Sequence, residues 1–227
     1  QIEGVEASQV TFEDIAAFPE PGWQVPRAVK FSPSEDTVTY LMSEAGTEEM
    51  ALMAQDLGTG AKRTLLRASQ LVTTEEKSLA QELRDERQRK RIKGITDYQW
   101  AAKKDLLLVP MGSALFLSDL AGTVTPVREG KGAPIDAKLC ADGTKIAYAL
   151  GSELALLDVA TKKETFLTKD AKPGITRGQS DFNAQEEFDE PSGHFFSPDC
   201  SSLLYLEVDE TGVGEVPILG HRGGAPS

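Results

Sequence analysis

Two adjacent acids, Glu186 and Glu187, stand near the middle of an acidic and aromatic segment that runs from residue 181 to residue 199. Successive side chains of a strand point to opposite faces, so these carboxylates can converge on one ligand only from a helical turn or a kinked loop. We predict a short turn. Two converging carboxylates suit a ligand that presents an ammonium group with three donors. We therefore hypothesise that this turn binds the free N-terminus of a peptide; the alternative is that the paired acids are solvated surface.

Few other residues could bind a metal or react. Cys140 and Cys200 lack the spacing of a zinc site, and we predict that both are free thiols in turns, with a disulfide as the alternative. His194 and His221 have no close partner of metal-ligand type. We therefore predict no metal and no cofactor. The sequence has no Gly-x-Ser-x-Gly motif and no Ser, Asp and His in the order of a hydrolase triad, so we predict no catalytic residue and no activity for this chain alone.

Composition narrows the class of protein. The 227 residues carry a formal net charge of -12, with 40% hydrophobic residues, which predicts a packed and soluble protein. An acidic chain is a poor partner for nucleic acid or for an anionic membrane surface. The most apolar run, residues 106–117, is interrupted by Pro110 and is too short for a membrane span. The chain begins at Gln1, as expected after removal of a signal peptide or trimming.

The chain repeats itself. An aromatic or Leu, small residues, a polar turn and an apolar run occur together at residues 31–41, 100–109, 139–148 and 196–206. A second signature, an apolar run that ends in a polar turn, follows the first three at residues 50–58, 115–120 and 154–159. The spacing is 39 positions both from Trp100 to Leu139 and from Asp119 to Asp158. This period is close to the roughly 40–45 residues of a four-stranded propeller blade, whereas a sandwich of short strands predicts no such matched spacing.

The repeat predicts an all-β fold, a partial β-propeller of about three to four blades. A closed four-bladed ring is the alternative, but nothing after Glu207 reads as strands that would complete the last blade. An open end leaves an unpaired strand edge and an uncovered blade face. We therefore expect the blades to depend on polypeptide outside these residues.

Two insertions interrupt the repeat. The first, at about residues 73–93, is predicted to be a charged α-helix that begins at a capping box of Thr73 and Glu76. Residues 84–93 contain six basic and two acidic side chains, which favours an anionic neighbour, and the Glu186 and Glu187 pair is the obvious one. The alternative is a solvated charged helix. The second insertion, at about residues 177–194, holds the acidic turn. Its aromatic residues are expected to bury and hold the turn rigidly; they are Phe182, Phe188, Phe195 and Phe196.

Four segments of the chain are similar to one known family. They are residues 86–100, residues 135–138, residues 185–193 and residues 208–210. The Glu-Glu turn combined with the basic helix resembles the N-terminal propeller of bacterial dipeptidyl peptidase IV and its relatives in the prolyl oligopeptidase clan. The similarity covers nearly the whole chain. Among the departures, Phe195 and Phe196 stand where relatives have Trp-Trp, and Cys140 with Ala141 stands where they have Ser-Pro.

The resemblance implies an eight-bladed propeller followed by an α/β-hydrolase domain, which is absent from residues 1–227. It implies release of dipeptides from peptide N-termini, preferably after Pro or Ala, by a homodimer that is periplasmic or secreted. By resemblance, Glu186 and Glu187 match the acids that bind the substrate α-ammonium. Arg87 best matches the arginine that contacts the substrate backbone in the same pocket, with Arg84, Arg89 or Arg91 as alternatives.

Two other functions compete with the exopeptidase reading. The first is a non-catalytic propeller module that binds a peptide or protein partner. The second is a glycosidase-like use of the carboxylates, which adjacent acids serve badly because catalytic acids must face the glycosidic bond from both sides.

Overall fold

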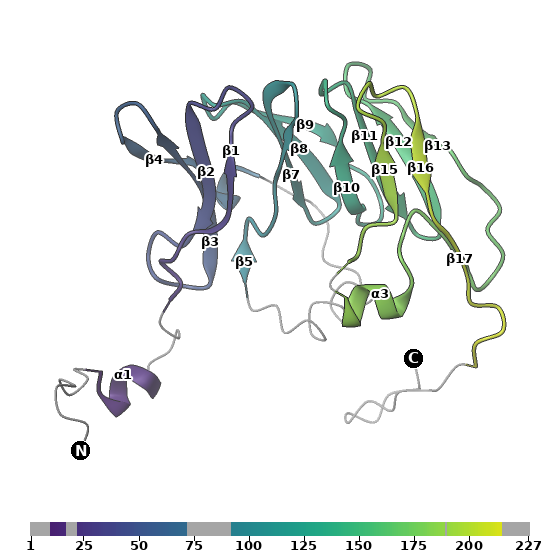
Figure 1. Ribbon diagram of the computed structural model, residues 1–227, viewed down its shortest axis with the longest axis horizontal. Helices are drawn as coiled ribbons and strands as arrows, with labels where there is room; N and C mark the ends of the chain where they lie inside the picture. The colour runs from purple at the N-terminus through teal and green to yellow at the C-terminus, as the bar shows by residue number, and fades with distance from the viewer. Residues whose placement is uncertain (1–9, 17–21, 72–91, 189, 215–227) are drawn as a thin grey trace.

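The computed structural model describes residues 10–16, 22–71, 92–188 and 190–214 (Figure 1). Three antiparallel sheets of four sequential strands follow one another along the described chain. The first contains β1 (Arg27–Phe31), β2 (Thr37–Met42), β3 (Glu49–Asp56) and β4 (Lys62–Leu66). The second contains β6 (Gln99–Ala101), β7 (Lys104–Met111), β8 (Ala114–Ser118) and β9 (Val124–Arg128). The third contains β10 (Ile135–Leu139), β11 (Lys145–Leu150), β12 (Glu153–Asp158) and β13 (Glu164–Phe166).

A fourth unit begins after the third sheet. Strands β15 (His194–Phe196) and β16 (Leu203–Tyr205) form a hairpin, and β17 (Glu207–Asp209) pairs with β14 (Ile175–Arg177). Four shorter elements complete the described chain: helix α1 (Phe12–Ala16), helix α3 (Phe182–Glu187), a 3-10 turn at Ala68–Gln70 and the two-residue strand β5 (Lys93–Gly94). In Figure 1 the sheets stand side by side and α3 lies below them, near the fourth unit.

The same turn chemistry ends the third strand of each complete sheet. The side chains of Asp56, Asp119 and Asp158 accept a hydrogen bond from the backbone N–H of Thr59, Thr123 and Thr161, at 2.7, 2.9 and 2.8 Å. A short Asp side chain that accepts a hydrogen bond from the backbone a few residues later stabilises a turn, where the strand no longer has a neighbour to pair with. These are the polar turns that close the second sequence signature, which explains why that signature repeats.

The core lies between the sheets. Leu107, Val109 and Phe116 of the second sheet pack in one buried cluster with residues of the first sheet. Leu108 and Leu115, their neighbours on the same strands, pack in another cluster with residues of the third sheet. Because side chains alternate between the two faces of a strand, the second sheet buries both faces. That arrangement explains the continuous apolar run near residue 107 and distinguishes stacked blades from a two-layer sandwich.

The predicted fold class, an all-β partial propeller, is therefore confirmed, with three complete blades and the first hairpin of a fourth. The predicted inserted helix, at about residues 73–93, falls almost entirely outside the described residues. Its last residue, Lys93, lies in β5 (Lys93–Gly94), which pairs in parallel with the start of β3. Within the described ranges, no helix is both long and apolar enough to cross a lipid bilayer.

Tyr98 joins the first two blades through a buried polar network. Its side chain is fully buried, and its hydroxyl lies within hydrogen-bond distance of the carbonyl oxygens of Ala28 and Thr39, at 2.6 and 2.8 Å. The hydroxyl of Thr39 in turn accepts a hydrogen bond from Nε1 of Trp100 at 3.0 Å. Burial raises the pKa of Tyr98 to about 12, so the phenol stays protonated and remains a donor.

Replacement of Tyr98 by Phe is expected to lower the free energy of unfolding by about 1–2 kcal/mol, because buried carbonyl groups lose their donor while ring packing is kept. Urea unfolding measures the change. Tyr40→Phe is the matched control, since Tyr40 is also buried but its hydroxyl makes no hydrogen bond within the described residues. Equal losses in the two variants would contradict a specific role for the Tyr98 hydroxyl.

Candidate functional site

The acidic segment is a loop whose two ends are tied together. Gln179 and Ser192 form an isolated antiparallel bridge at its base. Gly193 packs so closely on the backbone of Gln179 that a Cβ atom there would overlap it. The backbone N–H of Leu206 donates to the carbonyl of Gly193 at 2.8 Å, which joins the base of the loop to the end of β16. The loop therefore leaves and rejoins the fourth blade at a fixed place.

Helix α3 forms the tip of this loop, and polar side chains stabilise it. Asp181 is the N-cap, and its carboxylate accepts a hydrogen bond from the backbone N–H of Ala184 at 3.0 Å. The side chain of Gln185 donates to the carbonyl of Ser180 at 2.7 Å, and the Ser180 hydroxyl donates to the carbonyl of Glu190 at 2.7 Å. These bonds account for the helical turn that the acid pair was predicted to need.

Glu186 and Glu187 are the last two residues of α3, and both are exposed. Acids at a helix C-terminus face the negative end of the helix dipole and its unpaired carbonyl groups, and the last turn of α3 itself contains no basic residue. The same features concentrate negative potential at the tip of the loop. Helices usually have basic residues at this end, and a departure from such a preference at an exposed position is typical of a binding site. The negative charge here favours a cationic ligand.

The aromatic side chains do not hold the loop as predicted. Phe182, Phe188 and Phe195 are 57%, 77% and 44% exposed, and Phe196 is half-buried. The prediction that all four are buried was wrong for Phe182, Phe188 and Phe195, because the hydrogen bonds of the cap and the loop base fix this segment without apolar packing. The ring of Phe195 instead contacts the ammonium of Lys138, which lies 4.3 Å from the ring centroid.

Asp136, Lys138 and His194 support the loop from behind. His194 is fully buried, with Nδ1 at 2.8 Å from the carbonyl of Gly178 and 3.8 Å from the carboxylate of Asp136. Lys138 pairs with the same carboxylate at 3.1 Å and donates to the carbonyl of His194 at 2.6 Å. Burial raises the pKa of Asp136, an effect that the charges of Lys138 and His194 partly offset. This cluster anchors the start of β15 to the third blade.

The structure places only part of the predicted site. It positions Glu186 and Glu187 next to each other on a fixed helical turn. Arg87 and its alternatives, Arg84, Arg89 and Arg91, lie outside the described residues, so the meeting of a guanidinium with the acid pair stays a prediction. Sequence reasoning missed the supporting roles of Asp136 and His194, since 58 positions separate these residues along the chain.

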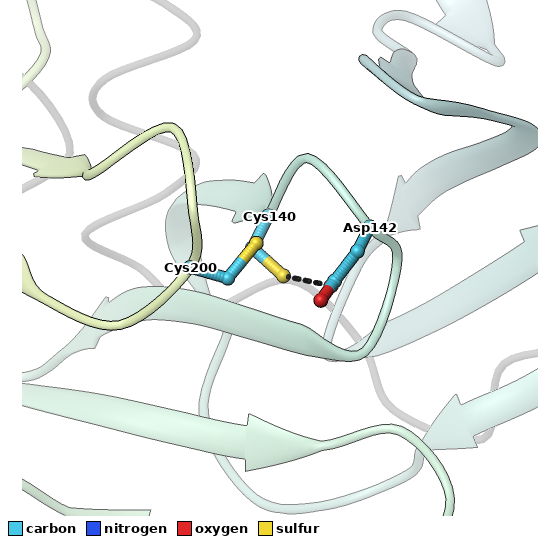
Figure 2. Close-up of side chains that lie close together, drawn as sticks. All are labelled: Cys140, Asp142 and Cys200. Atoms are coloured by element: carbon cyan, nitrogen blue, oxygen red, sulfur yellow. Dashed lines mark hydrogen bonds between the residues drawn. The ribbon is translucent and has the colours of Figure 1, made fainter.

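The predicted free thiols are confirmed, and both are buried. The structure also brings them together, which their separation in sequence had hidden. In Figure 2 Cys140 and Asp142, from the turn after β10, face Cys200 from the turn after β15. Burial, followed by interaction with Cys140, raises the pKa of the Cys200 thiol to about 11.

Comparison with known proteins gives consistent matches. The family model described as the dipeptidyl peptidase IV (DPP IV) N-terminal region matches residues 91–223. Dipeptidyl peptidase 4 of Trichophyton equinum is 27% identical over 210 residues, and the match covers 83% of this chain and 24% of that protein. This chain thus spans about a quarter of the length of that relative.

Solved structures share the fold. The crystal structure of Porphyromonas gingivalis dipeptidyl peptidase 4 matches with a TM-score of 0.63 and 18% identity, over 88% of this chain and 28% of that chain. The crystal structure of the tricorn protease matches with a TM-score of 0.51 and 15% identity, over 92% of this chain and 17% of that chain.

Proposed function

Because this chain belongs to the dipeptidyl peptidase IV N-terminal region family, we propose that it is the propeller segment of a serine exopeptidase that binds the free N-terminus of peptide substrates, so that dipeptides are released. The observation that carries the proposal is the acid pair at the end of α3. Glu186 and Glu187 are adjacent and exposed, stand at the negative end of a helical turn, and lie within the residues that the family model matches.

The chemistry of this turn fits an α-ammonium group. Carboxylates accept charge-assisted hydrogen bonds from its three N–H donors, and the carbonyl groups at the end of α3 add partial negative charge. Two neighbouring acids repel, and a nearby guanidinium favours the ionised form of both. We assign that role to Arg87, which would also contact the backbone of the substrate.

Binding the amino end of a peptide also explains why the product would have a fixed length. A substrate that is tethered at its N-terminus presents the same peptide bond to a nucleophile at a constant distance, as proximity requires. The nucleophile, its base and the oxyanion donors belong, in this proposal, to an α/β-hydrolase domain outside residues 1–227.

Exposed apolar side chains at both ends of the described blades support a longer propeller. Val29 and Phe31 of β1 are 55% and 63% exposed, and Leu204 and Tyr205 of β16 are 68% and 40% exposed. The equivalent strands β6, β10 and β11 of the second and third blades have no exposed residue. We propose that further blades cover these surfaces, and that the complete enzyme is a periplasmic or secreted homodimer.

The proposal is tested with the full-length protein and two chromogenic substrates, Ala-Pro p-nitroanilide and its N-acetylated form. We expect cleavage of the free-amine substrate and a kcat/KM lower by about 100-fold or more for the acetylated one, because acetylation removes the charged donor. Equal cleavage of both would contradict recognition of the N-terminus. Binding of free-amine peptides without any cleavage would instead support a non-catalytic module.

A further inference from the structure

Two turns from neighbouring blades face each other at one edge of the sheets. Residues 140–144 join β10 to β11, and residues 197–202 join β15 to β16. The Sγ atoms of Cys140 and Cys200 and a carboxylate oxygen of Asp142 all lie within 4.8 Å of one another. The thiol of Cys140 donates to Oδ1 of Asp142 at 2.8 Å (Figure 2). Three groups that can bind a metal through sulfur or oxygen therefore meet between two blades.

The first cysteine stands where the first and fourth blades have serine and the second blade has Ala102. Ser32 and Ser197, like Cys140, directly follow the first strand of their blade, and their hydroxyls donate to Asp36 and Asp199 at 3.2 and 2.6 Å. A hydroxyl is a better donor than a thiol, so the turn itself gains nothing from sulfur at this position.

The second cysteine stands at a position that favours glycine. Cys200 is the fourth residue after the first strand of its blade and has a φ of 60°, in the left-handed region. Gly143 holds the equivalent position in the third blade, with a φ of 76°. Glycine adopts this conformation without strain, whereas a residue with a Cβ atom rarely does. The first blade has Glu35 at the equivalent position, with a φ of 59°, so glycine is favoured there but not required. Neither turn needs a cysteine at its position, and the two cysteines face each other.

Two thiolates and a carboxylate are a typical ligand set for Zn²⁺. With metal–ligand distances of about 2.0–2.3 Å, ligand atoms of a tetrahedral site lie about 3.5–3.8 Å apart. The sulfur of Cys140 and Oδ1 of Asp142, now hydrogen-bonded at 2.8 Å, would separate by less than about 1 Å when the thiol proton is lost, and the other pairs, within 4.8 Å, would approach by at most about 1 Å. Asp142 is exposed, so solvent can reach the site and a water molecule can occupy the fourth coordination position. The backbone N–H and hydroxyl of Thr144 donate to Oδ1 of Asp142 at 2.9 and 2.6 Å and orient the carboxylate.

Positive charges surround the same turn. The ammonium of Lys145 donates to the carbonyl of Cys200 at 3.0 Å, and that of Lys103 donates to the carbonyl of Pro198 at 3.0 Å. A divalent cation with two thiolates and one carboxylate carries a net charge of -1. The two lysines therefore complement a metal-loaded site rather than repel it.

We propose that Cys140, Cys200 and Asp142 bind a zinc-class divalent cation that joins the third blade to the fourth. The metal cross-links the turns at residues 140–144 and 197–202, and so fixes the β15–β16 hairpin that follows the α3 loop. The prediction of no metal rested on spacing along the chain, and 60 positions separate the two cysteines. Metal binding displaces the thiol protons, so the site is compatible with the protonated thiols of the structure.

The test is titration of the full chain, reduced and freed of metal, first with Co²⁺ and then with Zn²⁺. We expect one Co²⁺ per chain with the near-ultraviolet charge-transfer band of thiolate ligands, and loss of that band when Zn²⁺ is added. Zn²⁺ should also raise the thermal unfolding midpoint, because it binds the folded state. Absence of the thiolate band, or an intramolecular disulfide in chain purified without reductant, would overturn the proposal.

The matched variants use residues that equivalent turns already accept. Cys140→Ser introduces the serine of the first and fourth blades, and Cys200→Gly introduces the glycine of the third blade, which adopts a positive φ without strain. Each variant should weaken Zn²⁺ binding by more than about 100-fold. Loss of a residue that only hydrogen-bonds to a ligand costs about 10–100-fold, so a larger loss indicates a direct ligand. Asp142→Asn should also lower the affinity for Zn²⁺. Asp36→Asn, which changes the acid of the first-blade turn, should leave the affinity unchanged. Unchanged affinity in both cysteine variants would show binding by surface carboxylates and contradict the site.

Discussion

The double variant Glu186→Gln, Glu187→Gln is expected to lower kcat/KM for a free-amine dipeptidyl substrate by about 100-fold or more in the full-length enzyme that we propose. A hydrogen bond to a charged group contributes about 1.5–3 kcal/mol, and the amide side chains keep the size of the acids but not their charge. Two such losses correspond to at least two powers of ten in rate. The measurement is steady-state kinetics with Ala-Pro p-nitroanilide.

The stability of the same variant separates a binding role from a structural one. Removing two negative charges from the C-terminal end of α3 relieves an unfavourable interaction with the helix dipole, but it also removes the proposed pairing with Arg87. Each effect is worth about 1 kcal/mol or less at an exposed site, so the unfolding temperature should change little. Glu190→Gln, an exposed acid of the same loop, is the control and should retain full activity. An unaltered kcat/KM in the double variant would remove Glu186 and Glu187 from the site. A variant that loses activity only because it unfolds would show a lower midpoint.

The blades were predictable because their pattern is local and repeated. The run around Leu107 and Leu108 reads as a strand buried on both faces, and the Asp-to-Thr turns recur at the same place in three blades. Pairings without a local pattern were not predictable. Strand β5 has two residues, and β14 pairs with β17 although 30 positions separate the nearest paired residues, Arg177 and Glu207.

The candidate site was predictable only in part. The need for a helical turn at Glu186 and Glu187 followed from side-chain geometry, and α3 is that turn. The predicted burial of the aromatic residues failed, because a hydrophobic ring is buried only where another element covers it. No described element covers the ring of Phe188. The meeting of Cys140 with Cys200 depends on how two blades stack, which no spacing along the chain reveals.

Loss of Arg128 is expected to have the largest effect on stability, because this buried side chain joins the second and third blades. It is 6% exposed, and its Nε donates to the carboxylate of Glu164 at 2.8 Å. Its other nitrogens donate to the carbonyls of Ser113, Gly132 and Lys131. Arg128→Ala leaves these acceptors without their donor and opens a cavity. We expect the free energy of unfolding to fall by about 3 kcal/mol. This is the lower end of the cost of breaking a buried ion pair, because Glu164 is partly exposed.

Two comparisons identify which feature of Arg128 matters. Arg128→Lys keeps the charge but not the planar set of donors. Its free energy of unfolding should therefore lie between those of wild type and Arg128→Ala. Arg67→Ala breaks a similar pair with Glu44, at 2.7 Å, but those side chains are 54% and 37% exposed, so solvent screens the interaction and the loss should be much smaller. Equal losses at Arg67 and Arg128 in urea unfolding would show that burial of the pair is not what stabilises the interface between the blades.

The pH dependence of the Arg128→Ala effect gives an independent check. Burial acts to raise the pKa of Glu164, but hydrogen bonds from Tyr148 and Arg128 and the charge of Arg128 outweigh it, so the pKa lies below its usual value of 4.5. A group with a lowered pKa in the folded state contributes its stability above the unfolded pKa and loses it as the pH falls through the folded pKa. The difference between wild type and Arg128→Ala should therefore be complete at neutral pH and shrink below about pH 4. A difference that stays constant down to acid unfolding would assign the effect to the carbonyl contacts of Arg128 rather than to its pairing with Glu164.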